Sequence, residues 1–526
     1  MEKQWVKNGK YKTVDEYIKS KTGQTLDILC ASDTVKYICP GIHEIADKIR
    51  AAISAKKKIT VIVDYDADGI CSGAEIYMIL KALGADMKII IPKRKSDGYG
   101  MNLRMLEDAP DNSVIITIDN GIAAIEPIAE AKRRGMEVYI MDHHLQGPVI
   151  PNADIIVDPE AFPQGWTFAH YCGAGLTFKL AQEMFPDNQE FLDKLSCFAA
   201  IATVADSVNV TGDNRNIILR GLRNLNSRVC TDGMKAVLNV LRQKDKLEHV
   251  DIYELAYKLG PMINAPGRLH DDGGLFVLKT FFQTGEKANE FAQKLFDINK
   301  SRKELVDQVI TNAEPKGEKI AFLFDKDIPE GICGIIAGHL ATEMHKPTFV
   351  MTYTEDGTIK GSARSEENVD VFELMQHAKE KFTKFGGHKC AAGFSLEAKD
   401  LDEVFQILED NAPDAAEDDK QFYDLDLKGA ELLNAYLRLN RLGVYGEGLE
   451  LPIIRFRGQV EKPRYLGDDK QHFSCTSNNI KCIGFSLADK YREKGEPPVM
   501  FIYGTLTTNW WNGHPSVQFQ MQDFEV

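Results

Sequence analysis

Apolar and polar positions alternate in blocks along the first part of the chain. Runs of β-branched and other apolar residues predict buried strands over 56–66, 86–92, 113–121 and 136–144. Between these runs, apolar residues recur at helical spacing over 69–85 and 122–135. Strands that alternate with helices are typical of an α/β unit with a mostly parallel sheet.

After this first part of the chain, the pattern of apolar and polar residues changes twice. From about 215 the chain is helical, and the amphipathic stretch 286–314, which lacks glycine and proline, predicts a connector helix. A second α/β pattern begins near 316, and the polar, acidic stretch 412–420 indicates a linker after it. Short β-rich runs separated by turn residues then predict a small β-barrel. The expected fold class is therefore α/β, with two α/β domains joined by a long helix and a C-terminal barrel.

Composition narrows the function classes. The net charge of −15 argues against indiscriminate nucleic-acid binding, although it leaves room for a local basic groove. The first residues are polar, and the chain lacks a run of apolar residues long enough for a membrane span, so we expect no membrane association. Ten scattered cysteines without a CxxC pair predict free thiols, no disulfides and a cytoplasmic location.

Acidic and histidine residues gather at one kind of position. Each of them follows a predicted strand or, for the last, an apolar helical run: Asp66, Asp68, Asp119, His143, His144 and Asp206. The carboxyl edge of an open α/β sheet is where ligands bind. Carboxylates suit Mg²⁺ and imidazole adds a preference for Mn²⁺, so two such ions per site are expected.

A structural interpretation competes with this one. Asp68 alone could cap the following helix, and His143–His144 alone could be a surface pair. Four strand or helix ends that are all rich in Asp and His are poorly explained by capping, and the combination therefore favours a metal site.

The motifs resemble a known superfamily. "DYDADG", "TIDNG", "MDHH" and "VADSV" are similar, in order, to the four motifs of the DHH phosphoesterases. The resemblance implies metal ligation by Asp66, Asp68, Asp119, His143 and Asp206, with Asp119 bridging the two ions. It makes His144 a ligand or a contact of the scissile phosphate. It makes Asp64 and Asp142 neighbours that orient the site through hydrogen bonds.

Further stretches resemble the RecJ family within this superfamily. They are "IPKRKSDGYGMN", "GPMINAPGRL", "GSARS", "FGGHKCAAGFS" and the closing "NWWNGHPSVQFQMQDFEV". By this resemblance Arg94, Arg268, Ser362 and Arg364 form a pocket for a terminal 5′-phosphate, and Gly387 and His388 contact substrate. Taken alone, Arg94 fits a solvated basic face better, Arg268 fits a structural turn, and His388 fits a residue that bonds the backbone.

The resemblance also implies a domain division. It comprises an N-terminal segment packing on the catalytic domain (1–50), a DHH catalytic domain (51–215), a helical region with the connector helix (216–315), a DHH-associated substrate-binding domain (316–411) and an oligonucleotide-binding (OB) barrel (412–526). Basic or aromatic candidates for strand binding in the barrel are Arg455, Arg457, Lys462, Arg464, Tyr465, Trp510 and Trp511. We expect one of the two tryptophans to pack in the core.

The implied activity is that of a single-strand-specific 5′-to-3′ DNA exonuclease. It would release 5′-mononucleotides in DNA repair and recombination, with a narrow passage between the two α/β domains that excludes duplex. Its partner is single-stranded DNA with a 5′-phosphate, and a single-strand-binding protein or a helicase is a candidate protein partner. Two alternatives stay open: a phosphodiesterase of short oligonucleotides or cyclic dinucleotides, and a catalytically silent binder of single strands or replication partners.

Overall fold

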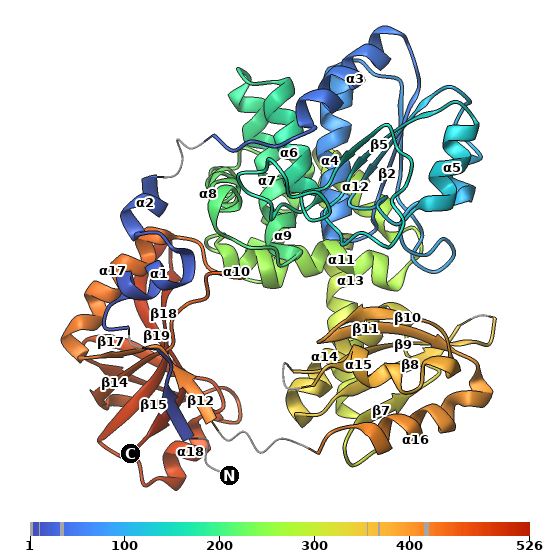
Figure 1. Ribbon diagram of the computed structural model, residues 1–526. Helices are drawn as coiled ribbons and strands as arrows, with labels where there is room; N and C mark the ends of the chain where they lie inside the picture. Colours follow the sequence, from blue (N-terminus) through green and yellow to red (C-terminus); the bar gives the residue numbers. More distant parts are fainter. Residues whose placement is uncertain (1–3, 10, 32–35, 355, 367–368, 415–419) are drawn as a thin grey trace.

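The protein folds into two α/β domains, a helical region between them and a C-terminal β domain (Figure 1). The structure is a computed structural model that describes residues 4–9, 11–31, 36–354, 356–366, 369–414 and 420–526. Most of the predicted linker at 412–420 lies outside these described residues.

The first α/β domain is built on a five-stranded parallel sheet in the order β3-β2-β4-β5-β6. Its strands are β2 (Ile59–Val63), β3 (Met87–Ile90), β4 (Val114–Ile118), β5 (Glu137–Met141) and β6 (Ile155–Val157). Its flanking helices are α3 (Ile42–Ser54), α4 (Ala67–Ala82), the 3₁₀ turn η2 (Leu103–Leu106), α5 (Ile125–Arg133) and α6 (Gly173–Met184).

Both faces of this sheet are buried, which explains the continuous apolar runs in the sequence. Val61 of β2 and Ile116 of β4 face a core shared with α3, α4 and α6. Ile62 and Ile115 point the other way, into a core shared with η2 and α5. The polar residues that follow each strand are thereby excluded from both cores and collect at the carboxyl edge of the sheet.

A helical region follows and ends in one long helix. Its elements are α7 (Gln189–Ala205), α8 (Gly212–Ser227), α9 (Asp232–Lys244), α10 (Ile252–Glu254), the π turn η3 (Leu255–Leu259), α11 (Gly260–Leu269), α12 (Gly273–Phe281) and α13 (Gly285–Thr311). Helix α13 has 27 residues and leads into the second α/β domain, as the connector prediction requires.

The second α/β domain has a five-stranded sheet in the order β10-β11-β9-β8-β7, in which only β7 and β8 are parallel. Its elements are β7 (Ala321–Phe324), η4 (Glu330–Ile332), α14 (Cys333–Met344), β8 (Thr348–Tyr353), β9 (Ile359–Arg364), α15 (Val371–Gln376), η5 (Lys379–Lys381), β10 (Phe382–His388), β11 (Ala391–Leu396), η6 (Ala398–Asp400) and α16 (Leu401–Asn411). Helices α13 and α14 share a core with one face, and α15 and α16 share a core with the other.

The C-terminal domain contains a seven-stranded sheet in the order β13-β14-β18-β19-β17-β16-β15. Its elements are β12 (Lys420–Tyr423), β13 (Leu425–Leu427), η7 (Gly429–Glu431), α17 (Leu432–Leu442), β14 (Ile454–Gln459), β15 (Glu461–Leu466), β16 (His472–Ser477), β17 (Ile480–Gly484), α18 (Ala488–Glu493), β18 (Val499–Trp511) and β19 (His514–Glu525). The long β18–β19 hairpin turns between Trp511 and His514.

The N-terminal residues correct one expectation. The strand β1 (Gln4–Lys7) pairs with β12, and α1 (Val14–Thr22) and α2 (Leu26–Ala31) pack on α17, so this segment belongs to the C-terminal domain (Figure 1). Helix α3 and the residues just before it pack on the first α/β domain, where Ile38 N donates to Thr167 Oγ1 at 2.9 Å. The physical reason is that Trp5 stacks on Tyr503, at 4.3 Å between ring centroids, and donates to Asp523.

Two observations bear on composition. No helix among the described residues is long and apolar enough to cross a membrane. All ten cysteines, which lie within the described residues, are free thiols.

Candidate active site

The loop after β2 carries the first group of carboxylates. Asp66 caps helix α4, and its Oδ1 accepts hydrogen bonds from Asp68 N at 3.0 Å and Gly69 N at 3.2 Å. A Cβ at position 69 would collide with the backbone of Asp64, so this glycine is required by close backbone packing rather than by an unusual dihedral angle. Capping accounts for Oδ1 of Asp66 and leaves Oδ2 available to a metal ion.

Asp68 is held by a different helix. Its carboxylate accepts hydrogen bonds from Gly173 N at 2.6 Å and Ala174 N at 2.8 Å, the first backbone amides of α6. A Cβ on Gly173 would lie 2.7 Å from Asp119 Cβ, so only glycine fits there. Gly173 is a functional residue that the sequence analysis missed. The "CGAG" that begins a helix was its only signal.

Asp119 follows β4 in a left-handed conformation. Its φ is +61°, and its backbone N–H donates to Met141 O at 2.9 Å. Non-glycine residues adopt this region at an energetic cost that is commonly found at functional sites. Asn120 secures the loop by donating to Ile62 O and Ile118 O. The carboxylate of Asp119 is thereby aimed at the cluster.

The two histidines have different surroundings. His143 Nε2 lies 3.0 Å from Asp119 Oδ1, 3.5 Å from Asp206 Oδ2 and 3.6 Å from Asp68 Oδ2. Asp206 is the C-cap of α7, as its position after an apolar helical run predicts. The structure therefore brings three of the predicted carboxylate ligands together around the imidazole of a fourth predicted ligand, His143.

His144 faces a different partner. Its Nδ1 lies 2.7 Å from Asp142 Oδ1, and Asp142 also accepts from the backbone N–H groups of Ile122 at 2.9 Å and His143 at 2.8 Å. The hydroxyl of Tyr99 lies 3.2 Å from His144 Nε2. Tyr99 belongs to the "SDGYGMN" stretch, and its place beside His144 was not predicted.

The electrostatics of the cluster are unfavourable without cations. Burial and the neighbouring Asp68 raise the pKa of Asp119 well above its usual range, and burial and Asp68 raise the pKa of Asp206 to about 9. Burial acts to lower the pKa of His144, but its hydrogen bond to Asp142 raises that pKa to about 9. Burial lowers the pKa of His143, which favours the neutral form that ligates metals.

The donor set fits divalent cations. The groups that could each hold one ion are Asp64, Asp66 and Asp119; Asp68, His143 and Asp206; and Asp119, His143 and His144. Asp119 and His143 are each shared by two groups, which suits adjacent ions. Asp64 Oδ1 is buried and has no hydrogen-bond partner among the described residues. A cation would satisfy it, so the structure makes Asp64 a candidate ligand beside its predicted orienting role.

A second cluster is cationic. The guanidinium of Arg94 lies 4.1 Å from the centre of the Tyr65 ring, and its buried Nε has no partner among the described residues. Arg268 donates to Gly331 O at 2.9 Å. Burial, Arg94 and Arg302 lower the pKa of Arg268 to about 10. Guanidinium groups held together in this way form an anion site.

Helix α14 completes this cluster. A Cβ on Gly334, in its first turn, would lie 3.0 Å from the Arg364 guanidinium and 3.2 Å from Ser362 Oγ. The start of the helix therefore contacts both predicted residues, and the positive end of its dipole favours anions. Gly334 and Tyr65 were not predicted as members of the site.

His388 shares a sheet face with this cluster. Ala391 of β11 pairs with both His388 and Arg364, and Gly393 pairs with Ser362. A Cβ on Gly393 would meet open space, so this face is uncovered there. Gly387 has φ +155° and is crowded by the β11 backbone, so packing in the hairpin is enough to require a glycine there. Its contact with substrate stays a prediction.

The barrel candidates divide by environment. Arg455 lies over Phe501, at 4.0 Å from the ring centre, and pairs with Asp426, which is a structural arrangement. Trp510 stacks on His249 at 3.9 Å, whereas Trp511 is 70% exposed. The expectation that one of the two tryptophans packs in the core is therefore wrong: Trp510 is half-buried, and it stacks on a residue of a neighbouring segment.

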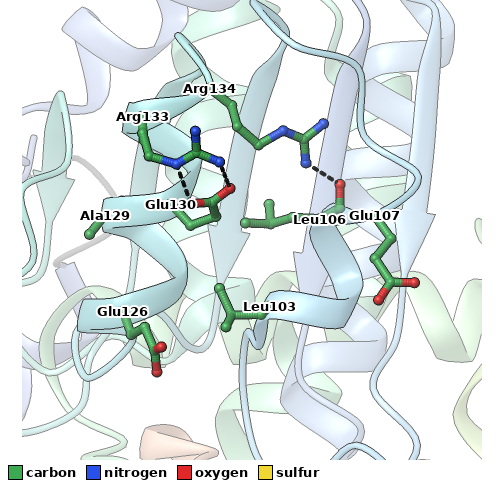
Figure 2. Close-up of a pocket in the computed structure, with 8 residues that line it drawn as sticks. All are labelled: Leu103, Leu106, Glu107, Glu126, Ala129, Glu130, Arg133 and Arg134. Carbon is green, nitrogen blue, oxygen red and sulfur yellow. Dashed lines mark hydrogen bonds and ion pairs between the residues drawn. The ribbon is translucent and has the colours of Figure 1, made fainter.

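A surface pocket lies away from all of these residues. It is found between η2 and α5 (Figure 2). Its two arginines are paired: Arg133 donates to Glu130, and Arg134 donates to Leu106 O. None of the predicted site residues lines it, and it carries no role in the chemistry.

Comparison with known proteins shows which domain families the chain matches. Residues 58–203 match the DHH family, N-terminal domain, residues 317–412 match the DHHA1 domain, and residues 423–523 match the RecJ OB domain. These matches confirm the predicted fold class, including the OB-type barrel.

Individual relatives agree with these matches. The chain is 31% identical to the single-stranded-DNA-specific exonuclease RecJ of Bacillus subtilis over 92% of its own length and 63% of that protein. A solved structure of Thermus thermophilus RecJ with Mn²⁺ superposes with a TM-score of 0.80 at 25% identity, covering 97% of this chain and 75% of that one. Another solved structure of that protein is a complex with Mg²⁺.

The Escherichia coli RecJ exonuclease is 30% identical over 70% of this chain and 68% of its own length. Together with the three domain matches, this similarity confirms the resemblance seen in the motifs. The chain belongs to the RecJ family of the DHH phosphoesterase superfamily.

Proposed function

We propose that this protein is a metal-dependent exonuclease specific for single-stranded DNA, which hydrolyses the strand from its 5′ end, releases 5′-mononucleotides and acts in DNA repair and recombination. The observation that carries the proposal is that one helix joins the carboxylate cluster to the arginine cluster. On α11, Asn264 Oδ1 accepts from Ala67 N, between Asp66 and Asp68, and Arg268 lies one turn further on.

The carboxylate cluster supplies the hydrolytic centre. Asp66, Asp68, Asp119, His143 and Asp206, with Asp64, would hold two Mn²⁺ or Mg²⁺ ions. Bound there, two divalent cations activate a water and stabilise charge on phosphate oxygens. Asp142 fixes the ring of His144, which contacts the scissile phosphate as a hydrogen-bond donor.

The arginine cluster sets the polarity of cleavage. Arg94, Arg268, Ser362 and Arg364, with the first turn of α14, would bind a terminal 5′-phosphate. One α-helical turn advances about 5.4 Å, on the order of the spacing between neighbouring phosphates of a strand. A 5′-phosphate held at Arg268 therefore brings the first internucleotide phosphate to the metal cluster, and a mononucleotide is the product.

Two other functions make different predictions. A phosphodiesterase of short oligonucleotides or cyclic dinucleotides would need the same metal cluster but no OB domain. A silent binder would keep the OB domain without needing paired ligand groups. The presence of both features favours the exonuclease. A single-strand-binding protein or a helicase would supply the strand in the cell.

The test is product analysis on a 5′-phosphorylated single strand, with Mn²⁺ and with chelator, beside the same strand in blunt duplex and a dinucleotide. We expect metal-dependent release of 5′-mononucleotides from the 5′ end, with the duplex spared. Hydrolysis of the dinucleotide alone would support the short-substrate enzyme. Binding without hydrolysis by the metal-loaded protein would support the silent binder.

A further inference from the structure

One continuous helix, formed by α10, η3 and α11, runs past the site. One side of this helix is buried in the core through Leu255, Leu259 and Met262. On its outward side, five residues follow one another at spacings of four, four, three and four and form a stripe. Residues three and four apart lie on one face of a helix. The stripe is therefore one surface, composed of Tyr253, Tyr257, Pro261, Asn264 and Arg268.

The second half of this stripe already belongs to the proposed site. Asn264 bonds the loop between Asp66 and Asp68, and Arg268 belongs to the arginine cluster. At the start of α11, a Cβ on Gly260 would lie 2.9 Å from Ala205 Cβ, next to Asp206. The helix thus passes alongside the metal cluster for most of its length.

The first half of the stripe is aromatic. Tyr253 is 58% exposed and Tyr257 is 63% exposed, and their ring centroids are 4.6 Å apart. Neither ring is part of a hydrophobic core among the described residues. The π turn that carries Tyr257 is a local distortion of a kind frequent at functional sites. We call these two rings the tyrosine ledge.

The C-terminal domain approaches the ledge from its other side. At the tip of the β18–β19 hairpin, Gly513 N donates to Glu248 Oε2 at 2.9 Å, and Trp510 stacks on His249. His249 precedes Tyr253 by four residues in the sequence, in the segment that leads into α10. The ledge therefore lies between the metal cluster and the hairpin of the OB domain, on the route that a strand bound to both must follow.

We propose that the tyrosine ledge stacks bases of the substrate strand on the 3′ side of the scissile phosphate, an inference that rests on the proposed function. Tyr257 lies 11 residues before Arg268 in sequence, which corresponds to about 16 Å along a helix axis. A stacked strand advances about 3.4 Å per nucleotide, so the ledge meets roughly the fifth base from the 5′ end, and an earlier one if the strand is extended. Stacking on aromatic rings tolerates any base, as a nuclease that removes every nucleotide in turn requires.

The test compares three variants with the wild-type protein. They are the double variant Tyr253→Ala/Tyr257→Ala, the matching Tyr→Phe double variant, which keeps both rings, and Tyr353→Ala, a control at an exposed tyrosine (44%) of β8. Thermal unfolding of each variant checks the fold. Fluorescence anisotropy with a long 5′-phosphorylated strand, in chelator, gives the Kd, and hydrolysis of a dinucleotide and of the long strand gives kcat and KM.

The alanine variant should raise the Kd and the KM for the long strand by about tenfold or more. Its kcat/KM on the dinucleotide should match the wild type, because a dinucleotide does not reach the ledge. The phenylalanine variant and Tyr353→Ala should behave as the wild type. Abasic sites at about the third to fifth positions from the 5′ end should weaken wild-type binding and remove the difference between wild type and the alanine variant.

An alanine variant that binds the long strand as the wild type does would overturn the inference. So would an alanine variant whose defect persists unchanged on the abasic strand. Failure of the proposed function is a separate result, because the wild-type protein would then release no mononucleotide from any strand.

Discussion

Replacing Asp206 by Asn should stabilise the metal-free protein. The pKa of Asp206 is raised to about 9 by burial and by Asp68, so the folded state binds a proton that the unfolded chain releases above its ordinary pKa of 3.8. The loss of folding stability begins when the pH rises above 3.8, and it grows until the pH reaches the pKa of the folded state. At pH 7 the difference is about 3 units at 1.36 kcal/mol each, roughly 4 kcal/mol.

Solvent reduces this penalty, because the side chain of Asp206 is 25% exposed. We therefore expect Asp206→Asn to raise the free energy of unfolding by about 2–4 kcal/mol at pH 7 in chelator. This gain in the free energy of unfolding should shrink as the pH falls toward 4. Mn²⁺ should stabilise the wild-type protein more than the variant, because the variant loses one ligand and with it most of its hydrolytic activity.

The assay is urea unfolding of both proteins from pH 4 to pH 8, in chelator and in Mn²⁺. The matched control is Asp142→Asn, which should change the free energy of unfolding in the opposite direction. Burial acts to raise the pKa of Asp142, but its hydrogen bond with His144 lowers that pKa, so this variant should lose about 1–3 kcal/mol. A metal-free Asp206→Asn protein that is less stable than the wild type at pH 7 would refute the reasoning.

Three further substitutions test other parts of the structure. Arg268→Ala should lower kcat/KM about 10- to 100-fold on 5′-phosphorylated strands and much less on 5′-hydroxyl strands, and equal losses on both would contradict a phosphate pocket. Gly173→Ala should weaken Mn²⁺ binding by about tenfold or more, because its Cβ would lie 3.0 Å from Asp68 Oδ2; calorimetry should show no such loss in Gly338→Ala, whose Cβ meets open space. Trp5→Ala should destabilise the C-terminal domain by about 3 kcal/mol without changing dinucleotide hydrolysis, and unchanged thermal unfolding would show that β1 adds nothing to that domain.

The sheets and the long helix were predictable because their patterns are local. The buried parallel strands appear as continuous apolar runs, and α13 appears as a long amphipathic stretch. The alternation of strands and helices is enough to predict that the carboxyl ends of the strands meet at one edge of the first sheet. The sequence therefore predicts that Asp119 and His143 lie close together.

The partners of those residues were not predictable, because they come from distant segments. Gly173 binds Asp68 from 105 residues away, and Gly331 accepts from Arg268 across 63 residues. Small residues carry no chemical signal of their own, and glycine at a helix start has several explanations. Residues 4–9 and 11–31 were misplaced for a similar reason: their apolar side chains meet their partners at the opposite end of the chain.

The choice between cap and ligand was unanswerable from the sequence because one carboxylate can serve as both. A carboxylate has two oxygens, and Asp66 uses one to cap α4. Asp68 is bound by the amides of α6, so two helix N-termini contribute partial positive charge to a cluster of acidic groups. These amides keep the carboxylates in place, while burial and the repulsion from neighbouring carboxylates still raise the pKa values of Asp119 and Asp206. The same arrangement thus holds the site together without ions and provides the electrostatic force that would draw them in.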